Sequence, residues 1–384
     1  MMQARSVEIL DALVGFPTVS RQSNLDLVSY VRELLVPLGA RISLVPNAEG
    51  TKANLYAVIG PCAGGGVLLS CHTDVVPVEG QAWTSEPFKL AARDDRLIGR
   101  GACDMKGFLA CALAAAESTV THKLARPLHL AFSYDEEIGC LGVRPLIETL
   151  VASENLPAFC IVGEPTMLET VIAHKGKVSG RVTCLGRECH SSHAPDGLNA
   201  IHLAVDMIDA MRGLQEELER GPQDADYSVP FTTVHVGTIA GGTALNIVPR
   251  ECTLDFEIRN LPSDPPDALL GRLFDKAAKL TRRAERRFAG TGVRIDVINS
   301  YPGLETAPQA EVVSLARRLV GDRPLRKIAF GTEGGLFRER LGIETIVCGP
   351  GDIRVAHRPD EYVTRDQLAR CDAMLERLVE QLCA

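Results

Sequence analysis

The residues best suited to chemistry are two histidines and a set of acids at separated points of the chain. His72 and Asp74 follow the apolar run "GVLLSC", and Asp104 lies in "GRGACDMKG". The remaining members come from "SYDEEIG", "IVGEPT" and "RVAHRPDE", and they are Glu136, Glu137, Glu164 and His357. Imidazoles combined with carboxylates suit borderline divalent metals, with Zn²⁺ first and Co²⁺ or Mn²⁺ as alternatives.

Each of these residues taken alone has a simpler explanation. A histidine at the end of a strand is often a hydrogen-bonded structural residue, and Asp104 before a helix could be an N-cap. Gathered together, several like charges would raise one another's pKa or open the fold unless a cation lay among them. Five ligand candidates and a spare acid favour two metals about 3.5–4 Å apart, bridged by a carboxylate and a water. The residues alone leave open whether Asp104 serves one metal or two, and whether Glu136 and Glu137 exchange roles.

The elements that must position these residues have α/β order as far as about Lys177. The runs "ANLYAVIG", "GVLLSCH", "LHLAFSYDEE" and "FCIVGEP" predict strands, and "MKGFLACALAAAEST" predicts an alanine-rich helix. Polar residues follow the strand ends, where open α/β sheets bind ligands. We therefore expect an α/β fold with a central mixed, mostly parallel sheet flanked by helices.

The pattern changes near Val178. Alternating strand-like runs and two long amphipathic helices, "NAIHLAVDMIDAMRGLQEELER" and "PDALLGRLFDKAAKLTRRAERR", predict a smaller α+β sandwich. The α/β pattern returns after "TGVRIDVINSYPG". The simplest account is a discontinuous larger domain, 1–178 and 296–384, interrupted by an inserted domain at 179–295.

Composition narrows the class of protein and its partners. The 384 residues carry a formal net charge of −8, which argues against a nucleic-acid partner. The amphipathic N-terminal stretch is unlike a signal peptide, and no apolar run approaches the roughly 20 residues of a membrane span. The twelve cysteines are scattered without a CxxC pair, which indicates reduced thiols. We expect a cytoplasmic protein with no membrane partner.

The motifs "SCHTDVVPV", "GRGACDMKG", "YDEEIG", "GEPT" and "AHRPDE", in that order, resemble the zinc-dependent aminoacylase, carboxypeptidase and desuccinylase family. The resemblance extends over nearly the whole chain. It implies a homodimeric di-zinc amidohydrolase that acts on a small N-acyl amino acid, with the inserted domain serving dimerisation and as a lid. Further motifs, among them "HSSHAPDGLNAI" and "FGTEGGLF", imply removal of acetate from N2-acetyl-L-ornithine in arginine synthesis.

The resemblance also implies a division of the metal ligands. Asp104 would bridge the two metals. His72 and Glu164 would complete one site, and Glu137 and His357 would complete the other.

Two further acids receive roles from the same resemblance. Glu136 would stay off the metals and act as the general base. Asp74 would hydrogen-bond the second ring nitrogen of His72 and fix its tautomer.

The remaining candidates concern the substrate. His190 would donate to the oxyanion in the neighbouring subunit's site, Asn246 would contact the substrate, and Arg259 would clamp its carboxylate. Glu333 would pair with a side-chain ammonium, and Thr332 would add a smaller polar contact. The simpler readings are a loop or cap histidine, a turn asparagine, a surface arginine and a solvent-facing acid.

Three other functions remain open at this level. A related deacylase, such as a succinyl-diaminopimelate desuccinylase, or a metallo-dipeptidase or carboxypeptidase would share the same ligands. A non-catalytic metal- or amino-acid-binding protein could also keep the scaffold, although Glu136 would then be a base without a purpose. His193 departs from common relatives and stays outside the predicted site.

Overall fold

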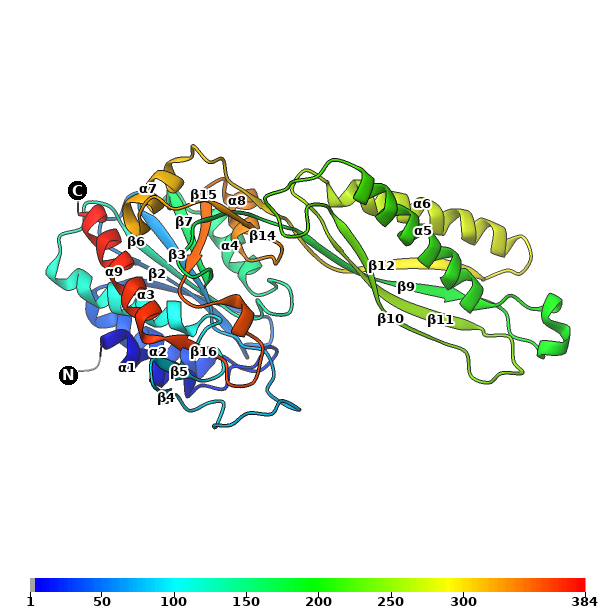
Figure 1. Cartoon of the computed structure of the whole chain (residues 1–384), viewed down its shortest axis with the longest axis horizontal. Coiled ribbons are helices and arrows are strands. Elements are labelled where there is room, and N and C mark those ends of the chain that lie inside the picture. The colour runs from blue at the N-terminus through cyan, green and yellow to red at the C-terminus, as the bar shows by residue number, and fades with distance from the viewer. Residues whose placement is uncertain (1–3, 384) are drawn as a thin grey trace. The chain divides into compact units, whose positions relative to one another are not determined.

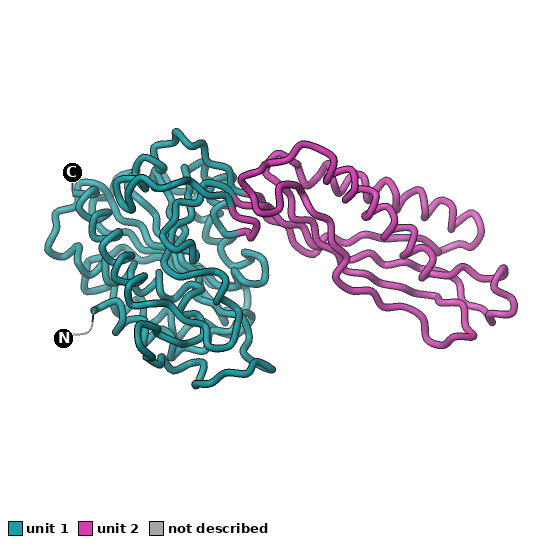
Figure 2. Tube along the Cα trace, viewed as in Figure 1, with its two compact units in different colours: residues 1–173, 304–327, 332–384 teal, residues 174–303, 328–331 magenta. Residues whose placement is uncertain are grey.

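The computed structural model describes residues 4–383 of the chain. The chain divides into two compact units, coloured separately in Figure 2. Unit 1 consists of Met1–Ala173, Leu304–Lys327 and Thr332–Ala384, and unit 2 consists of His174–Gly303 and Ile328–Gly331. The predicted insertion at 179–295 forms the central part of unit 2.

A large mixed sheet organises unit 1, and its central strands β6, β3, β7 and β15 are labelled in Figure 1. Its strands are β1 (Arg41–Pro46), β2 (Ala53–Ile59), β3 (Val67–His72), β6 (Leu128–Ser133), β7 (Phe159–Pro165), β8 (Val171–His174), β13 (Leu304–Glu305), β14 (Arg326–Ile328) and β15 (Glu344–Gly349). The order is β1-β2-β6-β3-β7-β15-β8-β13, with β14 paired to β8. The four central strands β6, β3, β7 and β15 are parallel, and antiparallel pairs flank them.

Helices pack against both faces of this sheet. They are α1 (Arg5–Val14), α2 (Leu25–Leu35), α3 (Lys106–Ser118), α4 (Val143–Val151), α7 (Glu311–Val320), α8 (Gly334–Leu341) and α9 (Arg365–Leu382). Alternate strand residues such as Leu69 and Leu130 join one apolar cluster with α1, α2, α3, α7 and α9. Their neighbours Leu68 and Ala131 are also buried, outside that cluster. The sheet is therefore covered on both faces, as parallel strands require.

The predicted alanine-rich helix is α3, and small residues allow it to lie close to the sheet. Gly163 of β7 shows how close, because a Cβ at this position would lie 1.8 Å from the Phe108 ring. This contact packs α3 directly against the strand that carries Glu164. A short sheet of β4 (Ala91–Arg93), β5 (Arg96–Ile98) and β16 (Tyr362–Thr364) completes the regular strands of unit 1.

Unit 2 is a four-stranded antiparallel sheet with two long helices. Its elements are β9 (Lys177–Leu185), β10 (Thr233–Gly241), β11 (Glu251–Arg259), β12 (Gly292–Tyr301), α5 (Ala200–Arg220) and α6 (Pro266–Glu285). The strand order is β10-β11-β9-β12. The helices share an apolar cluster with one face of the sheet through residues such as Met207, Leu273 and Phe256. The predicted fold class, a mixed α/β sheet with a separate smaller sheet domain, is confirmed.

Short 3₁₀ segments connect several of these elements: η1 (Val36–Leu38), η2 (Thr119–Thr121), η3 (Ser191–Asp196) and η4 (Ile353–Val355). All twelve cysteines are free, and most are buried. Across residues 4–383, no helix has the length and apolar character needed to cross a membrane.

Candidate metal centre

Parallel strands bring the predicted ligands to one edge of the large sheet. His72 is the last residue of β3, Glu164 lies near the end of β7, and Glu136 and Glu137 follow shortly after β6. These three strands are parallel neighbours, so their carboxyl ends meet at the same edge. Asp104 arrives just before α3, and the loop before β16 supplies His357.

Asp104 lies between the two histidines. Its Oδ1 is 3.0 Å from His72 Nε2, and its Oδ2 is 3.2 Å from His357 Nε2. Glu164 Oε1 lies 3.8 Å from His72 Nε2, and Glu137 Oε2 lies 3.0 Å from His357 Nε2. The five residues thus form two groups, each with one histidine and one glutamate, that share one aspartate.

Glu136 also lies close to His72. Ligand atoms of His72, Glu136 and Glu164 lie within 4.8 Å of one another, as do those of His72, Asp104 and Glu137. Distances alone would therefore allow Glu136 to bind a metal. Its Oε1 accepts from Cys140 Sγ at 3.3 Å, whereas Glu137 is the glutamate that contacts His357.

The electrostatics of the cluster follow from burial and close charges. Burial, reinforced by the charge of Asp104, raises the pKa of Glu137 to about 7 and that of Glu164 well above its ordinary value. Burial likewise raises the pKa of the Glu136 carboxyl. Burial opposes ionisation of Asp104 too, but hydrogen bonds from His357 and His72 outweigh it and hold its pKa below the usual range.

The histidines respond to the same acids. Hydrogen bonds to Asp104 and Glu137 raise the pKa of His357 to about 10. Burial disfavours the charged form of His72, yet the contact with Asp104 and the charge of Glu164 hold its pKa well above the ordinary value. The cluster therefore demands positive charge, which protons supply here and divalent cations would supply better. The mixed imidazole and carboxylate donors fit such cations.

Asp74 differs from the prediction. His72 Nδ1 donates to the main-chain carbonyl of Asp74 at 2.8 Å, whereas the Asp74 carboxylate lies 3.6 Å from Nδ1. The carboxylate instead accepts from the N–H groups of Glu136 (3.0 Å) and Glu137 (3.3 Å) and from Ser20 Oγ (2.7 Å). Asp74 thus fixes the tautomer of His72 through its backbone and holds the Glu136–Glu137 turn with its side chain.

Glu333 and Thr332 are both fully buried. The Glu333 side chain accepts from Ser133 Oγ at 2.5 Å and Ser70 Oγ at 3.1 Å, and the residue is 1% exposed. Thr332 Oγ1 accepts from the N–H of Gly334, the first residue of α8. Glu333 is therefore not the solvent-facing acid of the simpler reading. Burial does not separate it from the centre, because His72 is equally buried and its charge acts on Glu333. The predicted substrate contacts of both residues stay predictions.

The other three substrate candidates belong to unit 2. His190 is exposed, and its Nδ1 lies 2.7 Å from Ser192 Oγ and accepts from Ser192 N, which is the geometry of a cap. Asn246 is also exposed, and its main-chain carbonyl accepts from Ser191 N. Arg259 is partly buried, with its Nε–Nη2 edge facing the Glu257 carboxylate.

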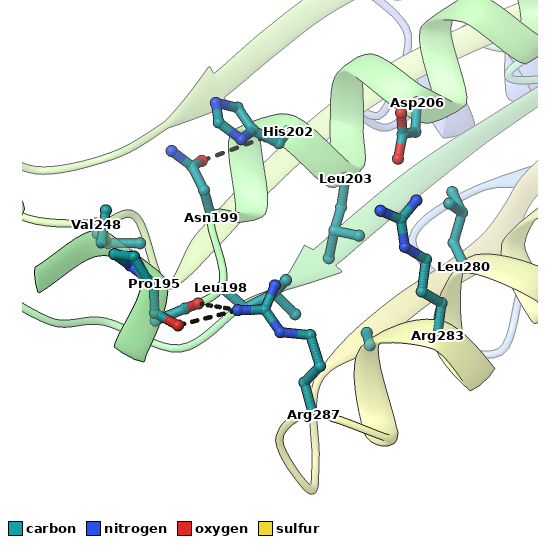
Figure 3. Close-up of a pocket in the computed structure, with 13 residues that line it drawn as sticks. Pro195, Leu198, Asn199, His202, Leu203, Asp206, Val248, Leu280, Arg283 and Arg287 are labelled. Atoms are coloured by element: carbon teal, nitrogen blue, oxygen red, sulfur yellow. Dashed lines mark hydrogen bonds between the residues drawn. The ribbon is translucent and has the colours of Figure 1, made fainter.

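A separate cavity of about 280 Å³ lies within unit 2 between α5 and α6 (Figure 3). Arg287, just after the end of α6, donates there to the carbonyls of Pro195 and Gly197, and Arg283 extends from α6. None of the predicted site residues lines this cavity. The chemistry predicted from the sequence therefore does not draw on it.

Three residues near the centre escaped the sequence reasoning. Arg100 and Glu361 are each 1% exposed and form an ion pair of 2.6 Å, and Gln81 bonds to Arg100. Arg100 and Glu361 stand inside the motifs "GRGACDMKG" and "AHRPDE". The sequence did offer one signal for them, because each is a charged residue inside a motif that also holds a proposed metal ligand.

Residues 68–381 match the family described as "Peptidase family M20/M25/M40". The chain is 37% identical over 379 residues to an acetylornithine deacetylase from Myxococcus xanthus, with 97% of this chain and 96% of the relative covered. It is 33% identical to an acetylornithine deacetylase from Pasteurella multocida (strain Pm70), with 98% of each covered. An M20 family metallo-carboxypeptidase from Sulfolobus solfataricus has the same fold, with TM-score 0.80, 20% identity and coverage of 99% and 100%.

Proposed function

The chain belongs to the M20/M25/M40 peptidase family, and we propose that it removes acetate from N2-acetyl-L-ornithine at a two-metal centre. Family membership and the deacetylase relatives make it a metal-dependent amide hydrolase. The substrate, its place in arginine synthesis, zinc as the metal, a homodimer and a cytoplasmic location belong to the proposal.

One observation carries the proposal of two metals. The two carboxylate oxygens of Asp104 face different histidines, at 3.0 Å and 3.2 Å, and each histidine has its own glutamate. A single ion needs only three or four ligands, whereas a bridging carboxylate suits a pair of ions. In this arrangement His72 and Glu164 would hold one ion, Glu137 and His357 the other, and Asp104 both.

The chemistry that two bound cations supply is polarisation of the acyl carbonyl and a lowered pKa for water at the site. The protein supplies the proton transfer. Glu136 takes a proton from the water that attacks the acyl carbon, and it returns that proton to the leaving nitrogen as the C–N bond breaks. Burial raises the pKa of Glu136, which suits a carboxylate that must hold a proton between these steps.

The residues of unit 2 complete the proposal. His190 donates to the developing oxyanion in the partner subunit's site, and Arg259 and Asn246 bind the substrate. The exposed positions of His190 and Asn246 support these roles. Glu333 pairs with the side-chain ammonium and Thr332 adds a smaller polar contact, and the preference for ornithine is further supported by the deacetylase relatives.

A substrate panel tests the proposed specificity. Purified protein loaded with Zn²⁺, and separately with Co²⁺, is given N2-acetyl-L-ornithine, N-succinyl-diaminopimelate, N-formyl amino acids and dipeptides, and released amine is quantified. We expect the highest kcat/KM on N2-acetyl-L-ornithine. Faster cleavage of another acyl amino acid or of a dipeptide, with little release of ornithine, would refute the substrate assignment.

The Glu136→Gln variant tests the proposed base separately from the substrate. Loss of a general base lowers kcat by roughly 10²–10⁴-fold. Because Glu136 is not a proposed ligand, bound zinc measured by atomic emission should stay at the wild-type level. The matched variant Glu137→Gln should lose zinc as well as activity. Retained activity in Glu136→Gln would show that another group moves the proton.

A further inference from the structure

A series of polar contacts, buried at Glu361 and partly exposed at Gln81, connects the main chain at Asp104 to the main chain at His357. Glu361 Oε1 accepts from the N–H groups of Cys103 and Asp104, each at 3.0 Å. The other carboxylate oxygen of Glu361 pairs with Arg100 Nη1 at 2.6 Å. The contacts of Glu361 thus hold the backbone from which the Asp104 side chain extends.

Gln81 connects Arg100 to the backbone of His357. Its Oε1 accepts from Arg100 Nη2 at 2.5 Å and from Trp83 Nε1 at 3.0 Å, and its Nε2 donates to the carbonyl of His357 at 2.9 Å. Two donors on one side and a carbonyl on the other fix the orientation of the amide. Arg100 also lies over the Trp83 ring, 5.1 Å from its centroid.

The backbone of His357 needs such support. Its φ of 62° lies in the left-handed region, which a residue other than glycine adopts when its surroundings hold it there. The His357 ring is about half exposed, so packing alone holds it weakly. The Gln81 amide donates to the carbonyl of this residue.

We infer that Gln81, Arg100 and Glu361 are positioning residues that set the separation of Asp104 and His357. The chain of contacts runs from one proposed ligand to the other without involving their metal-facing atoms. Groups that orient metal ligands typically change metal affinity by roughly 10–100-fold when they are removed. Because Gln81 contacts His357 and not Asp104, its own contribution is to the metal site completed by Glu137 and His357. This inference rests on the proposed two-metal centre.

Zinc titration of the metal-free protein tests the inference. Wild type is expected to bind two Zn²⁺ per chain by titration calorimetry. We expect Gln81→Ala to weaken one of the two binding events by about tenfold, the lower end of that range, and to leave the other nearly unchanged. Gln381→Ala, which makes the same change at an exposed position of α9, is the matched control and should bind as wild type does.

A double-mutant cycle shows whether the effect passes through His357. In a His357→Ala background, Gln81→Ala should add little further loss, because the residue that it positions is already gone. Glu361→Gln keeps an oxygen acceptor for the Asp104 N–H but loses the ion pair, and it should weaken zinc in the same way. Circular dichroism of each metal-free variant confirms that it is folded. If Gln81→Ala does not fold, Glu361→Gln decides.

The outcomes separate the two claims. If wild type binds fewer than two Zn²⁺, the two-metal centre fails. If wild type binds two and the folded variants bind both as tightly as wild type does, the positioning role fails and the two-metal centre stands. If Gln81→Ala has the same effect with and without His357, the glutamine acts elsewhere and the inference is overturned.

Discussion

The buried Glu333 carboxyl should make the metal-free protein less stable as the pH rises. Burial is the main reason that the pKa of Glu333 is raised from 4.5 to about 7, and the hydroxyls of Ser133 and Ser70 offset only part of it. The unfolded chain releases this proton near pH 4.5, but the folded chain keeps it up to about pH 7. The stabilisation is therefore fully present below pH 4.5 and is lost as the pH rises through 7.

The magnitude follows from the same two values. A pKa difference of about 2.5, at about 1.4 kcal/mol per pKa unit, corresponds to about 3 kcal/mol at pH 8. Glu333→Gln imitates the protonated carboxyl in shape and in having one donor and one acceptor group. The variant should match wild type near pH 4.5 and exceed its unfolding free energy by about 3 kcal/mol at pH 8.

The assay is urea unfolding in the presence of a chelator at several pH values. Trp83 is the single tryptophan and lies in unit 1, so its fluorescence reports the unit that contains Glu333. Glu33→Gln, at an exposed position of α2, is the matched control. The other acids of the metal centre titrate in both proteins, so the part of their contribution that does not depend on the Glu333 charge cancels in the difference. A difference between wild type and Glu333→Gln that stays constant from pH 4.5 to 8 would refute the reasoning.

Three further predictions concern other contacts of the site. Asp74→Ala leaves the N–H groups of Glu136 and Glu137 without their acceptor, and Trp83 fluorescence should show a loss of about 1–3 kcal/mol in unfolding free energy. Thr332→Val removes the acceptor for Gly334 N, and thermal melting should show a loss of about 1 kcal/mol in unfolding free energy. Chelation should abolish hydrolysis, and calorimetry should find tighter rebinding of Zn²⁺ at pH 8 than at pH 6. The reason is that Glu137, with a pKa of about 7, holds its proton at the lower pH and must release it to bind.

The residues at the strand ends could be predicted because the apolar pattern that indicates each strand also shows where that strand ends. The apolar runs before His72 and Glu164 form strands, and their apolar composition predicts that they are buried. Parallel pairing brings the carboxyl ends of these strands together. The proposed ligands at these strand ends then follow from residue type. The predicted N-cap reading of Asp104 is replaced by contacts with two histidines, which no local pattern encodes.

Residues whose role depends on distant partners were not predictable in the same way. "FGTEGGLF" has the composition of an exposed loop, yet Glu333 is buried because serines from β3 and β6 meet it. The sequence likewise does not distinguish the main-chain carbonyl of Asp74 from its carboxylate as the partner of His72. Gln81 is in no motif, and only the fold brings it to His357.

The same edge of the sheet carries an electrostatic cost that explains why the metal site and the fold depend on each other. Glu137, Glu164 and Glu333 all have raised pKa values because burial disfavours their charged forms. A sequence selected for stability alone would not place three such acids beside one buried aspartate. A cation bound to the folded state reverses this cost for the acids that bind it, and by mass action it stabilises the fold that assembles them. Glu333 contacts serines and is not a proposed ligand, so its cost should persist more fully than that of Glu137 or Glu164 when metal is bound.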